Sequence, residues 1–167
     1  TVDPTITFTI DDNAIGFGTL SNTTGRWATA DATGGNASPA LPTAANVLTV
    51  ATNASSGYAL TYNGATLTSG ANTIDVATVT GDGDGTQDTE QFGLSLSTSG
   101  DATIASGYQR DATPDFNFVA STTTTIASET GPTNTETFSV SYLANIRGNT
   151  EAGAYSTTIT YIATGTF

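Results

Sequence analysis

The chain is 167 residues long and has a formal net charge of −12, from 15 acidic residues against three basic ones. It contains no His, Cys or Met, and all three basic residues are Arg. Without His or Cys it lacks the commonest general base, the thiol nucleophile and the usual zinc ligands. The scarcity of cations argues against nucleic acid or an anionic membrane as partner, because both are bound through Lys or Arg.

The length predicts one domain that can bury a sufficient core without a metal or a disulfide. No run of 18 apolar residues occurs, so the sequence predicts no membrane span. Because the chain lacks Met, we interpret it as a mature secreted chain whose leader has been removed, and expect it outside the cell, at the cell surface. A chain trimmed at both ends is the alternative interpretation.

The amino end carries the clearest strand pattern. Residues 5–10 alternate between Thr and apolar residues, which places Ile6, Phe8 and Ile10 on one face. This period of two predicts a half-buried β-strand, which the polar residues 11–13 then end.

The remaining chain is predicted to be almost purely β, because no segment shows a helical period. A long loop is expected over residues 21–45, and an irregular stretch with packed Phe116 and Phe118 over residues 99–121. The dipeptide Asn63-Gly64 predicts a type I′ hairpin turn. Further strands are predicted over residues 14–20, 46–52, 58–62, 65–67, 72–79, 90–96, 137–143 and 154–167. Eight to ten strands at this spacing predict an all-β fold, an antiparallel β-sandwich or jelly roll.

One acidic cluster stands out in the loop from Gly81 to Glu90. Carboxylates on a Gly-rich loop are the ligands that Ca²⁺ prefers, with Asp11 and Asp12 as second-choice ligands. A solvated hairpin loop is the simpler and favoured interpretation. The four candidate calcium ligands are Asp82, Asp84, Asp88 and Glu90. No other cofactor is expected. No apolar wall and few aromatic residues surround these carboxyls, so we expect no catalytic residues and no enzymatic activity.

Three Asn-X-Ser/Thr sequons provide candidate glycosylation sites at Asn22, Asn36 and Asn53. The single Trp, Trp27, has two interpretations. It could serve as a platform for a sugar ring, together with exposed Tyr side chains, or it could close one end of the sandwich.

Several segments resemble small secreted β-proteins of bacterial surfaces. The resemblance rests on residues 5–8, 15–20, 53–58, 144–146 and 150–161, and on the final Phe167. The architecture is also similar to filament subunits that polymerise by donating a strand, as in chaperone–usher pilins and camelysin-type biofilm fibres. The chain lacks the pilin disulfide, but resembles the camelysin type as a Cys-free β domain with an apolar amino end. It shares an AGxY-type ending with WxL surface domains, without their Trp motif.

The sequence therefore leaves two alternative functions, of which the first is favoured. In the first, residues 1–13 form a donor strand and linker, residues 14–167 form the sandwich, and identical subunits join into a pilus or biofilm fibre. Ile6, Phe8 and Ile10 would then fill pockets in the next subunit. In the second, the chain is a monomeric module for adhesion or carbohydrate binding.

Overall fold

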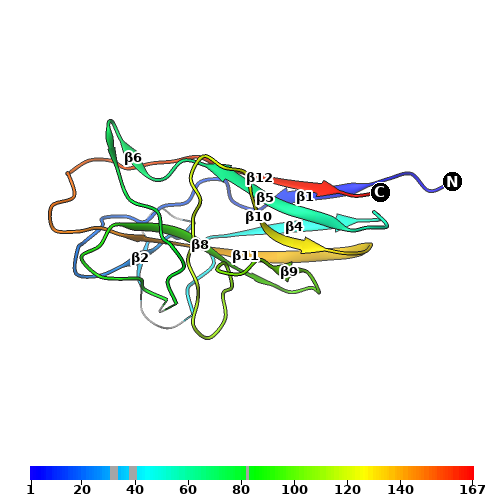
Figure 1. The fold of residues 1–167 in the computed structure, drawn as a ribbon, viewed down its shortest axis with the longest axis horizontal. Helices are drawn as coiled ribbons and strands as arrows, with labels where there is room; N and C mark the ends of the chain where they lie inside the picture. The colour runs from blue at the N-terminus through cyan, green and yellow to red at the C-terminus, as the bar shows by residue number, and fades with distance from the viewer. Residues whose placement is uncertain (31–33, 38–40, 82) are drawn as a thin grey trace.

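The structure is a computed structural model that describes residues 1–30, 34–37, 41–81 and 83–167. These residues form twelve strands and no helix, which confirms the predicted all-β fold. The strands make two antiparallel sheets that enclose a common core, consistent with a β-sandwich (Figure 1). Within the described residues, no helix is long and apolar enough to cross a membrane.

The first sheet is built around its longest strand, β11 (Thr133–Asn145). Strand β8 (Gln91–Thr98) pairs with one side of β11, and β4 (Asn46–Thr52) pairs with the other. Strand β1 (Ile6–Ile10) lies outside β4, at the edge of the sheet. The short strands β2 (Arg26–Trp27) and β3 (Gly35–Asn36) complete the six.

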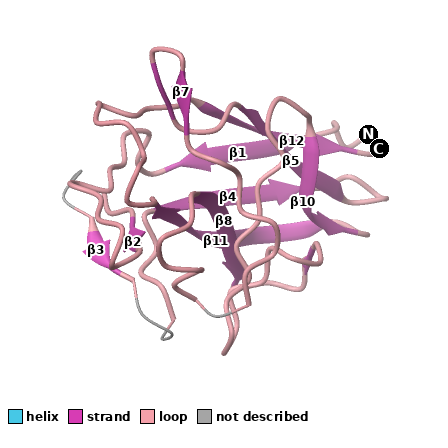
Figure 2. Ribbon diagram, turned by 60° about the vertical axis from the view of Figure 1, so that its left-hand side comes forward, coloured by secondary structure: helices cyan, strands magenta, loops and turns pink. Residues whose placement is uncertain are grey.

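The second sheet has the strand order β12-β5-β10-β9, and β12 lies at its edge (Figure 2). A separate two-stranded hairpin, β6-β7, projects from the sandwich. Their bounds are β5 Tyr58–Gly64, β6 Thr68–Ser69, β7 Asn72–Thr73, β9 Thr103–Ile104, β10 Thr124–Glu129 and β12 Ile159–Gly165.

The hairpin turn predicted at Asn63-Gly64 is wrong. Both residues lie inside β5, opposite Thr160 and Ile159 of β12. The ladder with the distant β12 therefore decides their conformation, and the local turn preference is overridden. The tight turn lies instead between β6 and β7, where Gly70 has a φ of 63° that glycine adopts without strain.

Aromatic side chains occupy the centre of the core. The ring of Phe118 lies 4.9 Å from that of Phe92 and 5.1 Å from that of Tyr62, measured between centroids. Phe116, also predicted to be packed, is fully buried. The irregular stretch of residues 99–121 thus contributes Phe118, whose ring contacts Phe92 of the first sheet and Tyr62 of the second, and such contacts contribute beyond the area they bury.

One acidic side chain, Glu136, is buried within β11. Its carboxylate accepts hydrogen bonds from the Tyr58 hydroxyl at 2.5 Å and from the backbone N–H groups of Asp101 (2.8 Å) and Ala102 (3.1 Å). Burial, and then the hydrogen bond to Glu136, raise the pKa of Tyr58 well above its ordinary value. Glu136 therefore ties the second sheet and the 99–102 turn to β11.

Replacement of this carboxylate should destabilise the fold. In Glu136→Ala three donors lose their acceptor, and we expect the free energy of unfolding to fall by about 2–4 kcal/mol in chemical denaturation. Glu129→Ala is the matched control, because within the described residues the side chain of Glu129 accepts hydrogen bonds only from its neighbour Thr130. Equal losses in the two variants would contradict the structural role of Glu136.

Candidate functional site

The candidate site lies along the open edge of the sandwich, where β1 and β12 are the outer strands of the two sheets. Phe8 lies opposite Val50, a fully buried residue of β4, in the β1–β4 register. Ile6 and Phe8 accordingly pack against the core, whereas Ile10 is 38% exposed. The alternation predicted from the sequence thus holds, and β1 covers the core incompletely.

The residues that precede β1 are attached mainly through Asn53. The side-chain amide of Asn53 donates to the carbonyl of Asp3 at 2.7 Å and accepts from the N–H of Thr5 at 2.8 Å. The hydroxyl of Thr52 also donates to the Thr5 carbonyl, at 2.8 Å. These bonds fix residues 3–5 against the end of β4.

Removal of the Asn53 side chain should loosen the amino end without unfolding the domain. We expect Asn53→Ala to speed hydrogen exchange at the Thr5 and Ile6 amides several-fold, and to lower the free energy of unfolding by only about 1 kcal/mol. Asn149→Ala is the control, since the exposed Asn149 side chain makes no hydrogen bond within the described residues. Unchanged exchange in Asn53→Ala would show that Asn53 does not fix the segment.

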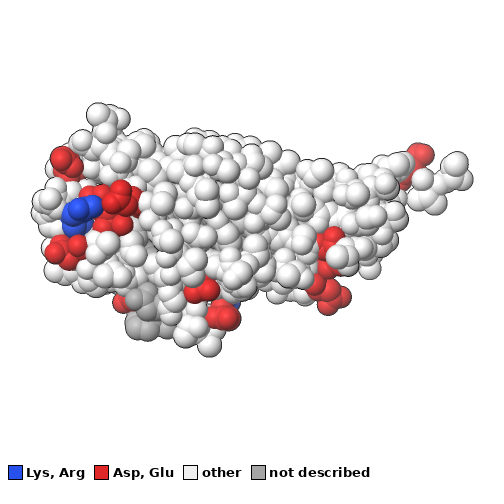
Figure 3. All heavy atoms as spheres, in the orientation of Figure 1, with Lys and Arg blue, Asp and Glu red and all other residues white. Residues whose placement is uncertain are grey.

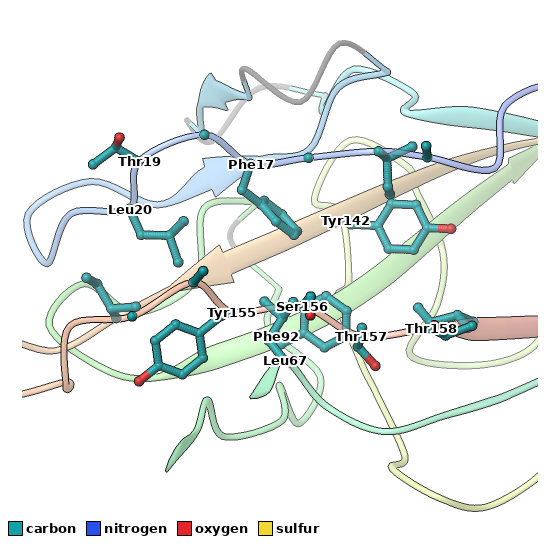
Figure 4. Close-up of a pocket in the computed structure, with 18 of the residues that line it drawn as sticks. Phe17, Thr19, Leu20, Leu67, Phe92, Tyr142, Tyr155, Ser156, Thr157 and Thr158 are labelled. Atoms are coloured by element: carbon teal, nitrogen blue, oxygen red, sulfur yellow. The ribbon is translucent and has the colours of Figure 1, made fainter. Parts of the chain in front are cut away.

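Beyond Ile10 the two edges separate and leave an apolar groove of about 900 Å³, which we call the edge groove. One rim is formed by residues 13–20 and the other by residues 150–159. Figure 4 shows Phe17 and Leu20 on the first rim and Tyr155, Ser156 and Thr157 on the second. The volume lies at the upper end of the range of ligand-binding pockets.

Both rims have unpaired backbone groups. Gly16 exchanges two backbone hydrogen bonds with Thr29, and Ser156 exchanges two with Thr68, each 2.9–3.0 Å long. Adjacent residues of an extended strand direct their N–H and C=O groups to opposite sides. The backbone groups of Ile15, Tyr155 and Thr157 therefore point toward the open edge, and they make no backbone hydrogen bond within the described residues.

The floor of the groove includes two linked tyrosines. The hydroxyl groups of Tyr142 and Tyr161 are 2.6 Å apart, and Tyr142 also donates to the side-chain carbonyl of Asn46 at 3.5 Å. Burial raises the pKa of Tyr142 to about 12 and that of Tyr161 well above its ordinary value. Both hydroxyls are therefore neutral hydrogen-bonding groups at physiological pH.

The buried tyrosines should make the fold sensitive to alkali. Because the folded-state pKa of Tyr142 is raised from 10.0 to about 12, its stabilisation is complete below pH 10 and is lost as the pH rises to about 12. This loss is on the order of 3 kcal/mol for Tyr142. Near-ultraviolet tyrosinate absorbance and circular dichroism should change together, and Tyr142→Phe should reduce the slope. Ionisation of all tyrosines near pH 10 in the folded state would contradict this account.

The acidic loop predicted to bind calcium is held by protein contacts. Asp88 accepts hydrogen bonds from the N–H of Gly148 and the amide of Asn22, and Glu90 accepts one from the Thr150 hydroxyl. Glu90 also pairs with Arg147 at 3.4 Å. The Asp84 carbonyl accepts from the Asn145 amide at 2.9 Å, and Asp82 lies outside the described residues. The described residues contain no group of three metal-ligating side chains, and the calcium site stays a prediction.

The candidate glycosylation sites have different surroundings. Asn36 and Asn53 are exposed, whereas Asn22 is partly buried. The Asn36 side-chain carbonyl accepts a hydrogen bond from Arg26 at 3.1 Å. Glycosylation of any of the three stays a prediction, and a glycan on Asn53 would replace an amide hydrogen at the group that holds Asp3.

Trp27 is buried, with 8% of its surface exposed, and its indole N–H donates to the carbonyl of Gly83 at 3.0 Å. Its ring packs with Phe116 and Leu143 in a second apolar cluster, separate from the main core, and the interpretation that it closes one end of the sandwich stays a prediction. The ring offers no free face on which a sugar ring could stack.

The comparisons with known proteins give no relative. No family model, curated protein or solved structure matches the chain.

Sequence reasoning identified the inward-facing residues of β1 at this edge but missed the edge groove. Most of its two rims comes from segments that were each predicted to be an ordinary strand, at residues 14–20 and 154–167. The only local signal was that both segments mix apolar residues with small or hydroxyl residues less regularly than β1.

Proposed function

We propose that this protein is the structural subunit of an extracellular filament, and that each subunit donates residues 1–10 to the next. The observation that carries this proposal is the position of β1. It is an edge strand whose backbone pairs only with β4 among the described strands, and it connects onward through the short polar segment of residues 11–13. Such a strand can detach without disrupting the pairing of any later strand.

The composition of the two outer strands favours self-association. Edge strands of monomeric β-proteins are usually protected by charged residues, Pro or bulges, because their free backbone groups can pair with another chain. Neither β1 nor β12 contains a charged residue or a Pro. An outer edge without such protection is expected where the edge has a partner.

Donation requires that a neighbouring subunit replaces the packing that β1 leaves in its own. The inward residues Ile6, Phe8 and Ile10 each contribute about 1.5–3 kcal/mol when they are fully buried. In the single subunit none of them is fully buried, so a more enclosed site in a neighbour would favour exchange. A contact between two different surfaces does not close on itself and therefore generates a fibre.

The alternative function, a monomeric module for adhesion or carbohydrate binding, loses the aromatic platform that sequence reasoning assigned to it, because Trp27 is buried. It remains the second candidate. The edge groove would then be its binding site, since Tyr155 lies on its rim.

A disulfide that locks β1 onto its own β4 tests donation directly. Thr7 lies opposite Ala51 in the β1–β4 register, and the natural chain has no Cys that could interfere. The oxidised double variant Thr7→Cys/Ala51→Cys should stay monomeric in size-exclusion chromatography and negative-stain images, whereas the reduced form should assemble. Disulfides need neighbouring residues of this kind, with Cα atoms within about 7 Å.

The matched control is Ala59→Cys/Thr164→Cys, which locks β12 onto β5 at an equivalent antiparallel pair. This variant should assemble in both redox states, because β12 is not donated. Deletion of residues 1–10 and Phe8→Asp should both give folded monomers that do not join filaments. Normal assembly of the oxidised β1–β4 lock would refute donation, and a natural chain that forms no filaments would refute the proposed function.

A further inference from the structure

We infer that the edge groove is the acceptor site for residues 1–10 of a second copy of this chain. This inference rests on the proposed function and deepens it, because donation alone does not say where the strand enters.

The chemistry of the rims indicates a peptide strand as the occupant. The unpaired backbone groups of Ile15 on one rim and of Tyr155 and Thr157 on the other can each pair with a strand laid between them. An added strand of this kind gains affinity from main-chain hydrogen bonds and specificity from alternate side chains. A lipid chain would leave these backbone groups unpaired, at a cost for every group removed from water.

The floor suits the apolar face of the donated segment. It contains Leu67, Phe92 and Tyr142, and Glu151 is the only charged residue among the described lining residues. Residues 1–10 likewise contain a single charged side chain, Asp3, and alternate apolar residues from Ile6 onward. The rim of residues 150–159 has the same number of residues as the donated segment.

The positions of donor and groove are those of a head-to-tail contact. Figure 1 shows the amino terminus at one end of the long axis, whereas the loops that lead out of β1 and into β12 lie toward the other end. These loops form the two rims of the groove. Val2, which is 86% exposed, belongs to the segment that extends from the first end. A donor at one end and an acceptor at the other generate an open linear assembly.

The competing arrangement is exchange at β4. A subunit that has donated its own β1 exposes the edge of β4, and a neighbour's β1 could occupy that place in the same register. The two arrangements differ for a subunit that keeps its own β1 on β4. Such a subunit can still bind a donated strand in its groove, but it cannot bind one at β4.

The oxidised Thr7→Cys/Ala51→Cys chain is such an acceptor, because its β1 stays on β4 and its groove stays open. We expect a fluorescent synthetic peptide of residues 1–10 to bind it saturably, measured by anisotropy. A peptide carrying Phe8→Asp should bind at least about tenfold more weakly, since Asp cannot enter an apolar groove without loss.

A substitution in the groove supplies the second test. Adding Leu20→Arg to the locked chain should weaken peptide binding about tenfold or more. Thr125→Arg on β10 is the matched control, because Thr125 is exposed and does not line the groove. Circular dichroism and thermal melting verify that both variants are folded.

Filaments provide a measurement that does not depend on these variants. Thr158→Cys on the groove rim, combined in turn with Thr5→Cys, Thr7→Cys or Thr9→Cys, should give a ladder of disulfide-linked oligomers in at least one combination. Filaments that assemble from the reduced Thr7→Cys/Ala51→Cys chain and are then oxidised should give no ladder of linked oligomers. In these filaments residue 7 of one subunit lies in the groove of the next subunit and not beside residue 51.

The outcomes separate the two proposals. In one outcome, oxidation of filaments of the Thr7→Cys/Ala51→Cys chain gives a ladder of linked oligomers, and the peptide does not bind the locked monomer. The donated strand then pairs with β4 of the neighbour. This outcome would overturn the groove as acceptor and leave the proposed function intact. Peptide binding to the locked chain in the absence of any filament would support the groove as a strand acceptor and overturn the proposed function. A peptide that binds equally well to the locked chain with and without Leu20→Arg would overturn the inference.

Discussion

The pairing of β11 with strands on both of its sides is the constraint on which the rest of the sandwich depends. Its length lets it pair with β8 on one side and with both β4 and β2 on the other. Phe138 and Val140 on β11 are fully buried, and Glu136 ties the same strand to the second sheet through Tyr58. Because β4 is fixed by β11 on one side, the only free place for β1 is the outer edge of β4.

This arrangement places the outer strands β1 and β12 next to the edge groove. The edge strands β1 and β12 contact each other at one end, and beyond Ile10 they diverge around the edge groove. Acidic groups lie at the ends and along the lower border of the face shown in Figure 3, and the centre of that face is uncharged. At a net charge of −12 per chain, Coulomb forces between copies are repulsive, so the proposed contacts between copies would depend on backbone pairing and apolar burial.

Much of the fold followed from local pattern. The strand predicted at residues 46–52 has the predicted bounds, and the alternation of Ile6, Phe8 and Ile10 gave the correct inward face of β1. Elements whose conformation depends on distant pairing were harder to predict. Strand β10 was missed because its run of Thr, Ala and Ser lacks a clear apolar alternation, and Asn63-Gly64 was assigned to a turn although β12 holds it in a strand. Sequence reasoning therefore did best where one face of a strand meets the core and the other meets water.

The sequence by itself determined that the protein is all-β, that it is poor in cations, and that its first strand is amphipathic. These properties follow from residue type and from a period of two, and both are local. Only the tertiary structure decided that β1 and β12 are both outer strands, that Trp27 is buried, and that residues 13–20 and 150–159 face each other across a groove. The two rims are more than 100 residues apart in the chain, so their approach is set by the order of strands in the sheets, which no local pattern encodes.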